Sequence, residues 1–137
     1  MGRRRRPETG GGRPNVRREG GPIEVFDNPF PGRDYEIEIS FPEFTSVCPK
    51  TGNPDFGEIR VKYVPDRFCI ELKSFKLYLH GYRNAGVFYE DAVNRILDDL
   101  VASCHPRVMT ITGSFNARGG MKTVVTACHE GRGRGKR

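Results

Sequence analysis

The pattern of apolar and polar residues predicts five β-strands. In three segments apolar side chains alternate with polar ones, a period of two that is typical of strands with one buried face, and two further runs are rich in β-branched residues. The first strand is expected to end at Pro42. Turn-forming residues between the segments favour antiparallel pairing. The predicted strands are residues 35–41, 58–64, 67–72, 108–115 and 121–128.

Apolar residues change to helical spacing in two places. Residues 74–82 predict a short helix, which the Ser74 side chain is expected to cap. Residues 88–104 predict a longer amphipathic helix, closed by Pro106. Its apolar stripe consists of Phe88, Ala92, Val93, Ile96, Leu97, Leu100, Val101 and Cys104. The element order indicates an α+β domain, with an antiparallel sheet and two helices on one of its faces.

Composition divides the chain of 137 residues into one domain and two tails. Residues 1–22 are rich in Arg, Gly and Pro and are expected to form a disordered basic tail, because they can bury little apolar surface. Residues 23–128 are the predicted domain, which opens with an irregular, proline-containing lead-in over residues 23–34. Residues 129–137 are predicted to be a second disordered basic tail.

The net charge of +6 is carried by the tails. Residues 1–20 carry +5 and residues 129–137 carry +3, which leaves −2 on the rest of the chain. The predicted domain is therefore not a basic nucleic-acid module. Four cysteines without a C-x-x-C pair, no secretory signal and no apolar run of about 20 residues indicate a reduced, cytoplasmic protein.

The central stretch Glu71–Tyr78 mixes charged and apolar residues where a strand is expected to pass into a helix. Free backbone N–H groups at the start of a helix favour anions, and Lys73 and Lys76 add two positive charges. This arrangement suits a ligand that carries phosphate. The alternative is a strand end with solvated lysines.

The segment 43–56 is expected to be an ordered loop that displays reactive groups. Cys48 lies next to Lys50 and is a candidate nucleophile with a lowered pKa. Asp55, between Pro54 and Phe56, is a candidate proton donor. From these residues alone, a buried structural thiol remains as open an interpretation of Cys48 as a nucleophile, and a turn-forming residue is the favoured interpretation of Asp55.

Together these segments resemble a known enzyme family. Residues 43–56, the run Glu-Leu-Lys-Ser-Phe-Lys-Leu-Tyr at 71–78, and the motifs at 80–84 and 88–91 resemble the short, single-module form of the QueF family. These are NADPH-dependent 7-cyano-7-deazaguanine reductases of queuosine biosynthesis, a pathway of tRNA modification. The resemblance spans roughly residues 23–128 and implies the tunnelling fold (T-fold).

The resemblance also implies a reaction. Cys48 would add to the nitrile carbon to give a covalent thioimide, while Asp55 supplies a proton. Two hydrides from two NADPH would then give the primary amine. Glu90 would bind the guanine-like edge, since its two oxygens match two adjacent N–H donors. As a first-turn helix residue, Glu90 would also interact favourably with the helix dipole.

Further binding residues follow from the same resemblance. The implied substrate-binding set also includes Tyr89, Glu71, Leu72, Lys73 and Ser74, and the implied NADPH-binding set is Lys73, Lys76 and Arg118. For Arg118 the alternative is a solvated turn residue. No metal and no direct contact with nucleic acid are expected. The family implies two stacked pentamers with sites between subunits.

One position departs from the family pattern. Where the family commonly has Phe-His-Glu, this chain has Phe88, Tyr89 and Glu90. Tyrosine offers an O–H to a bound base but supplies no cation near neutral pH, so any proton transfer by that histidine is in doubt here.

Four other functions compete with this interpretation. A zinc site could use Cys104, His105, Cys128 and His129, although their spacing fits no tight finger pattern. The amidine-forming relative from archaeal tRNA modification shares the Cys/Asp pair but lacks the lysine-bearing motif that is present here. Another pterin or deazaguanine activity of the T-fold, or RNA binding by the basic tails, are the remaining alternatives.

Overall fold

The computed structural model describes residues 21–131. Most of the predicted tails 1–22 and 129–137, namely residues 1–20 and 132–137, lies outside the described residues. Four strands, two helices and two further strands follow one another as an α+β domain, as the sequence predicts. Among the described residues, no helix is long and apolar enough to cross a membrane. The elements are β1 (Val25–Asp27), β2 (Ile37–Val47), β3 (Pro54–Val64), β4 (Phe68–Ile70), α1 (Leu72–His80), α2 (Tyr89–Cys104), β5 (Val108–Arg118) and β6 (Met121–Glu130).

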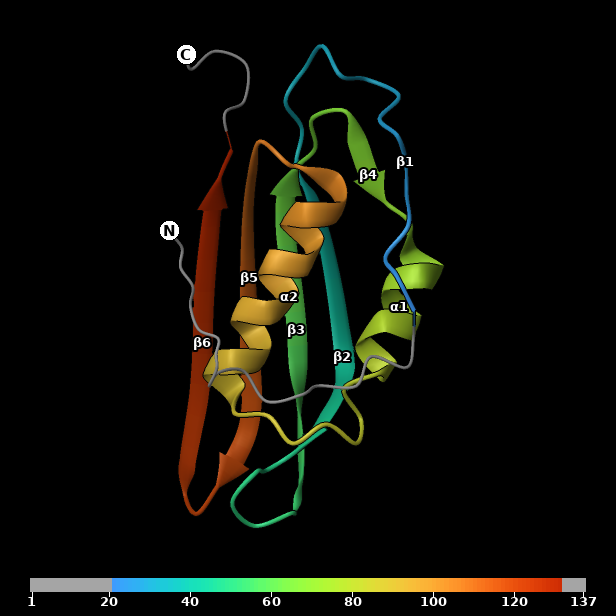
Figure 1. Ribbon diagram of the computed structural model, residues 1–137. Helices are drawn as coiled ribbons and strands as arrows, with labels where there is room; N and C mark the ends of the chain where they lie inside the picture. Colours follow the sequence, from blue (N-terminus) through green and yellow to red (C-terminus); the bar gives the residue numbers. More distant parts are fainter. Residues whose placement is uncertain (1–20, 132–137) are drawn as a thin grey trace, which may run out of the picture.

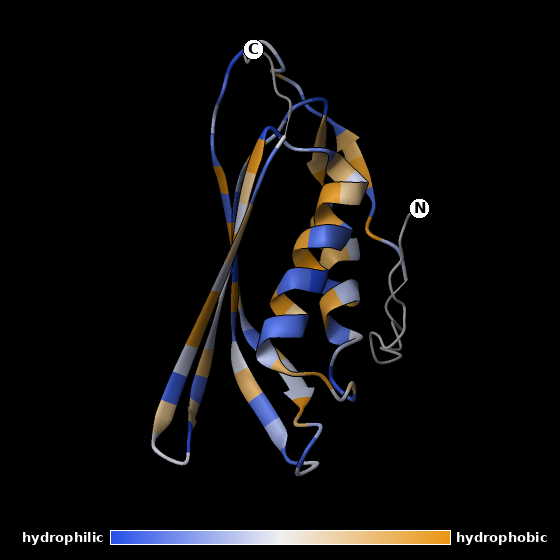
Figure 2. Ribbon diagram, turned by 60° about the vertical axis from the view of Figure 1, so that its left-hand side comes forward, coloured by the Kyte–Doolittle hydropathy of each residue, from blue (hydrophilic) through white to orange (hydrophobic). Residues whose placement is uncertain are grey.

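A four-stranded antiparallel sheet, in the order β2-β3-β5-β6, carries both helices on one face (Figure 1). Along β3, Ile59, Val61 and Tyr63 are buried beneath the helices, while Arg60 and Lys62 point to the other face. Figure 2 shows the sheet from the side, with the helices on one side only and with hydrophobic and hydrophilic residues alternating along the strands. The predicted placement of both helices on one face is confirmed.

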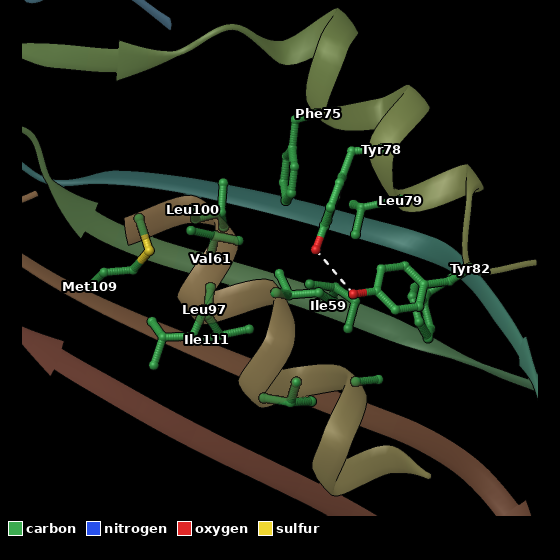
Figure 3. Packing of buried hydrophobic residues seen from close by; sticks show 14 of the residues in the cluster. Ile59, Val61, Phe75, Tyr78, Leu79, Tyr82, Leu97, Leu100, Met109 and Ile111 are labelled. Carbon is green, nitrogen blue, oxygen red and sulfur yellow. Dashed lines mark hydrogen bonds between the residues drawn. The ribbon is translucent and has the colours of Figure 1, made fainter. Parts of the chain in front are cut away.

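The hydrophobic core lies between the sheet and the two helices (Figure 3). Phe75 and Leu79 of α1 and Leu97 of α2 belong to one buried cluster with residues of β3 and β5. The Tyr78 hydroxyl donates to Asp99 Oδ2 at 2.5 Å and lies 3.0 Å from the Tyr82 hydroxyl. This buried polar contact joins α1 to α2.

Strand β2 corrects the prediction that a strand ends at Pro42. It continues to Val47, with a shift of register between Phe41 and Phe44. A bulge there accommodates Pro42, which has no N–H to donate, and β2 is an edge strand in this sheet. Strand β3 also begins earlier than predicted, at Pro54, so the predicted loop 43–56 shrinks to residues 48–53.

The small sheet formed by β1 and β4 is a second correction. The predicted strand 67–72 is only Phe68–Ile70, and it pairs with β1 instead of joining the four-stranded sheet. Its partner lies in the lead-in 23–34, which the prolines had indicated to be irregular; Val25–Asp27 precede those prolines and are free to pair. At the other end of the domain, β6 runs to Glu130, past the predicted boundary at residue 128.

The boundaries of α2 agree with the prediction to within one residue, whereas α1 begins and ends two residues earlier than the predicted 74–82. Helix α1 begins at Leu72, and its cap is Glu71 instead of the predicted Ser74. The Ser74 hydroxyl lies inside the first turn, where it donates to the Glu71 carbonyl and accepts the Glu24 N–H, both at 2.8 Å. Helix α2 matches the predicted 88–104, with Phe88 as its N-terminal cap residue.

Candidate active site

The loop that joins β2 to β3 holds Cys48 on a fixed backbone. The Cys48 N–H donates to the Asn53 carbonyl at 2.9 Å, and the Gly52 N–H donates to the Cys48 carbonyl at 2.8 Å. Gly52 has a φ of +78°, a conformation that favours glycine. Just before the loop, Val47 exchanges backbone hydrogen bonds with the segment 85–87. These contacts fix the position from which the thiol projects.

The Cys48 thiol is 7% exposed and has hydrogen-bond donors around it. Hydrogen bonds from the Thr51 side chain and backbone, then from Arg118, lower the pKa of Cys48 to about 7. The predicted lowering of this pKa is confirmed, but Lys50 contributes to it through its backbone N–H. A lowered pKa increases the share of thiolate near neutral pH, which is the form of a cysteine that can act as a nucleophile.

Asp55 is a buried carboxylate in strand β3, only 3% exposed. Its Oδ1 accepts a hydrogen bond from Arg118 Nη1 at 2.8 Å and another from the Tyr89 hydroxyl at 3.1 Å. The alternative of a turn-forming aspartate is wrong, because Asp55 pairs with Ser46 in the sheet. When Asp55 carries a negative charge, the ion pair with Arg118 offsets the cost of burying that charge.

Arg118, at the end of β5, contacts the residues around Cys48 and Asp55. Its guanidinium bonds to Asp55, lies 3.5 Å from Thr51 Oγ1, and has its pKa raised by contact with Cys48, Tyr89 and Asp55. The alternative of a solvated turn residue is wrong. The glycines that follow, Gly119 and Gly120, have positive φ and allow the tight turn into β6.

The first turn of α2 contributes Tyr89 and Glu90. The Tyr89 ring stacks on Phe115, with centroids 3.9 Å apart and planes 6° from parallel. Burial raises the pKa of Tyr89. The Glu90 side chain is exposed, and within residues 21–131 its carboxylate has no hydrogen bond or ion pair. Its two oxygens are therefore free to accept from a ligand.

The central stretch Glu71–Tyr78 departs from the prediction of open N–H groups at a helix start. The Glu71 carboxylate accepts from the N–H of Ser74 at 2.7 Å and of Lys73 at 3.0 Å. These backbone bonds lower the pKa of Glu71. The predicted anion site on these N–H groups is thus occupied by a side chain of the chain itself, whereas Lys73 and Lys76 are exposed on α1.

The structure brings together only part of the predicted site. Cys48, Asp55, Tyr89 and Arg118 form one group, and Glu90 follows Tyr89 directly. Helix α1 begins beside β1 and β4, away from the β2–β3 loop (Figure 1). No hydrogen bond or ion pair among the described residues links Glu71–Ser74 to Cys48 or Asp55.

The residues of the zinc alternative do not form a cluster. Cys104 is completely buried in the α2 stripe, where burial raises its pKa to about 12, and Cys128 is exposed on β6. In the described part of the chain, no group of three or more His, Cys, Asp and Glu side chains is arranged to hold a metal ion.

Comparison with known proteins gives the family. The model of the family described as "QueF-like protein" matches residues 54–134. The chain is 64% identical over 107 residues to the NADPH-dependent 7-cyano-7-deazaguanine reductase of Chlorobaculum tepidum, a match that covers 78% of this chain and 92% of that protein. The chain belongs to the QueF-like family.

Two more relatives carry the same description. The reductase of Chlorobium phaeovibrioides is 62% identical over 111 residues, 81% of this chain and 96% of its own length. That of Nitrosococcus oceani is 56% identical over 105 residues, 77% of this chain and 81% of its own length. The chain thus spans most of the length of these relatives, as the short, single-module form requires.

A solved structure has the same fold. The archaeosine synthase QueF-Like in its apo form superposes with a TM-score of 0.63, covering 72% of this chain and 94% of that chain at 22% identity. The predicted T-fold is confirmed by this likeness, which at that identity concerns the fold alone.

Two residues of the candidate active site were not predicted from the sequence. Thr51 and Phe115 were assigned no role, because a loop threonine and a strand phenylalanine are common in any protein. The position of Thr51 three residues after Cys48 was the available signal for a side chain that turns back onto the thiol. Phe115 gave no comparable signal, since its partner Tyr89 lies on a distant helix.

Proposed function

We propose that this chain reduces the nitrile of 7-cyano-7-deazaguanine to the primary amine, 7-aminomethyl-7-deazaguanine, with NADPH as co-substrate, in queuosine biosynthesis. Its relatives named as such reductases are up to 64% identical over most of their length. The observation that carries the chemistry is the Cys48 thiol, with its pKa lowered to about 7, beside the buried Asp55.

In the first step the Cys48 thiolate adds to the nitrile carbon. A C–S bond forms, one π bond of the nitrile breaks, and its electron pair moves to nitrogen, which takes a proton from Asp55. The product is a thioimide attached to the enzyme. Thr51 and Arg118 support this step because they stabilise the thiolate before it reacts.

NADPH, when bound, would supply hydride to the former nitrile carbon twice: the first would convert the thioimide to an imine as the Cys48 thiolate leaves, and the second, with a proton from water, would convert the imine to the amine. The residues present fit a phosphate-bearing cofactor. Lys73 and Lys76 are three positions apart on α1, so both exposed ammonium groups lie on one side of the helix. Arg118 is proposed for the same phosphates, and in that role it would have to release Asp55, to which it is bound here.

The nucleobase would be held by the free carboxylate of Glu90, with two oxygens facing two adjacent N–H donors. The stretch Glu71–Ser74 is proposed to complete the nucleobase site. Because this stretch lies away from Cys48 in one chain, it would do so from a neighbouring copy. The active site would then lie between subunits.

The sheet supports such an assembly. Strands β2 and β6 are its edges, and within residues 21–131 their outer sides pair with no further strand, apart from a bridge between Val47 and Gly86. Edge-to-edge pairing of copies would close a ring, and two stacked pentamers are the proposed form. Since the reaction needs a reduced thiol and all four cysteines are free, we place the enzyme in the cytoplasm.

The stoichiometry of the reaction tests this function. Purified protein is mixed with 7-cyano-7-deazaguanine and excess NADPH, and oxidised cofactor and amine are both counted. We expect two NADPH oxidised for each amine formed. Oxidation of NADPH without amine, or an amidine product, would contradict the proposal; turnover with NADH equal to that with NADPH would contradict a site for the 2′-phosphate.

A further inference from the structure

The two hydrogen bonds to the Asp55 side chain fall on the same oxygen. Arg118 Nη1 and the Tyr89 hydroxyl both donate to Oδ1, at 2.8 and 3.1 Å. Among residues 21–131, no side chain donates to Oδ2. The two oxygens of this buried carboxyl group are therefore not equivalent.

This asymmetry decides where a proton can sit. A neutral carboxyl group has one O–H and one carbonyl oxygen, and only the carbonyl oxygen is a good acceptor. A proton on Oδ1 would compete with two donors that already face that oxygen. The proton of a neutral Asp55 is therefore confined to Oδ2.

Tyr89 is held in place by a packed aromatic ring. Its own ring stacks on Phe115, and the Phe115 ring lies where a β-carbon on Gly57 or Gly113 would have to be, within 2.8 Å of ring atoms in each case. Only glycine at these two positions leaves room for the Phe115 ring. Gly113 leaves room for the Phe115 ring, the Phe115 ring packs on Tyr89, and the Tyr89 hydroxyl contacts the Asp55 carboxyl group.

The Tyr89 hydroxyl remains a donor over the working pH range. Burial raises the pKa of Tyr89, and the hydrogen bond to Asp55 acts in the same direction, while Arg118 opposes them. The hydroxyl is thus protonated near neutral pH and available to Asp55.

We propose that Tyr89 is a positioning residue for the proton donor: with Arg118 it fixes Oδ1 of Asp55 as the acceptor, so that Oδ2 delivers the proton to the nitrile nitrogen. This inference rests on the proposed function and gives Tyr89 a role different from the substrate-binding role that the family resemblance implies.

The Cys48 thiolate forms the C–S bond, a C–N π pair moves to nitrogen, and the Oδ2–H bond breaks to form the N–H bond. Asp55 is left as a carboxylate, and its new charge is stabilised by the donors from Tyr89 and Arg118. Water returns a proton to Oδ2 before the next turnover.

The test measures adduct formation by the full chain without NADPH. Wild type and the variant Tyr89→Phe are mixed with 7-cyano-7-deazaguanine over a range of concentrations, quenched at short times and weighed intact. Tyr89→Phe keeps the stacked ring but loses the hydroxyl. We expect the saturating rate to fall about tenfold or more, with the half-saturating nitrile concentration changed much less, because the hydroxyl stabilises the charge that Asp55 gains as it releases its proton.

Three further variants sharpen the test. Tyr35→Phe is the matched control, since Tyr35 also donates its hydroxyl to a side-chain oxygen, Asn28 Oδ1, but in the lead-in; it should leave the rate unchanged. In the background Asp55→Asn, removing the Tyr89 hydroxyl should have little further effect. Phe115→Leu should slow the reaction while keeping the hydroxyl.

The outcomes separate this inference from the proposed function. If wild type forms the adduct and Tyr89→Phe forms it at the same saturating rate, the positioning role is wrong and the function stands. A raised half-saturating concentration at an unchanged rate makes Tyr89 a substrate ligand and also overturns the inference. If wild type itself forms no adduct, the proposed function fails.

Discussion

Arg118 Nη1 lies 2.8 Å from Oδ1 of Asp55, although 63 positions separate the two residues in the chain. The contact links the end of β5 to the start of β3, and the same guanidinium contributes to the lowered pKa of Cys48. One cation thus serves both the candidate nucleophile and the candidate proton donor. The charge balance of the site depends on it.

Replacing Arg118 should therefore raise the pKa of Cys48. Wild-type Cys48 is expected to be alkylated with a midpoint near pH 7, and Arg118→Ala should move that midpoint upward, toward the ordinary value of 9.0. The pKa of Cys48 should rise because the positively charged Arg118, which favours the thiolate over the neutral thiol, is removed. The measurement is alkylation rate against pH in a Cys128→Ser background, since Cys128 is the exposed cysteine.

Thr51→Val is the companion variant, because the Thr51 hydrogen bonds are the largest cause of the lowered pKa. Its matched control is Thr126→Val, an exposed threonine on β6. An unchanged midpoint in both Arg118→Ala and Thr51→Val would show that these donors do not set the thiol's reactivity.

The lysines of α1 should affect the cofactor and not the thiol. Lys76→Ala is expected to raise the KM for NADPH several-fold, since one exposed charge pair with phosphate contributes about 1 kcal/mol. Adduct formation in the absence of NADPH should remain at the wild-type rate. Lys62→Ala, an exposed lysine on the helix-free face of the sheet, is the control. Equal KM values in the two variants would remove α1 from the cofactor site.

Arg107 is predicted to be a stability residue. Its side chain is 9% exposed and donates to the Pro31 and Arg33 carbonyls and to the carboxylates of Asp34 and Asp66. Arg107→Ala should lower the free energy of unfolding by about 1–3 kcal/mol, because it removes the hydrogen bonds by which a nearly buried guanidinium joins the lead-in to Asp66. The measurement is urea unfolding.

Arg60→Ala is the control for that experiment. Arg60 also contacts two carboxylates, Glu38 and Glu58, but about half of its side chain is exposed, at 47%. Ion pairs at such sites contribute less than about 1 kcal/mol. A loss in Arg107→Ala no larger than in Arg60→Ala would contradict the role of burial.

Gly113→Ala should destabilise the fold and disturb the site together. The added β-carbon would lie 2.6 Å from Val93 Cγ2 and 2.8 Å from the Phe115 ring, so α2 or the ring must move, at a cost of about 1–3 kcal/mol. Gly32→Ala, with open space around the new carbon, should have little effect. Equal unfolding midpoints of the two variants would show that the packing around Phe115 is looser than described.

The sequence alone predicted those elements in which one hydrophobic period runs through the whole element. The alternation of Ile59, Val61 and Tyr63 predicted β3, and the apolar stripe of residues 88–104 predicted α2, because a single buried face determines each pattern. Pro42 misled the prediction for β2, since proline ends a central strand but is tolerated in an edge strand at a bulge. Glu71 took the cap expected of Ser74, whose hydroxyl bonds to Glu24.

The site was predictable only in its local parts. Cys48 and Asp55 stand in one short segment whose composition indicates chemistry. The contacts of Arg118 and Phe115 join residues from different elements, and no local period in the sequence records which strands lie side by side. For the same reason the pairing of β4 with β1, instead of with the main sheet, was missed.

The most direct test of the account is the covalent adduct. The protein is incubated with 7-cyano-7-deazaguanine in the absence of NADPH, and its intact mass is measured for wild type, Cys48→Ala and the control Cys128→Ala. We predict that wild type and Cys128→Ala gain the mass of one nitrile molecule, that Cys48→Ala gains none, and that NADPH discharges the adduct. An adduct that persists in Cys48→Ala, or no adduct in wild type, would contradict the role of Cys48 as the nucleophile.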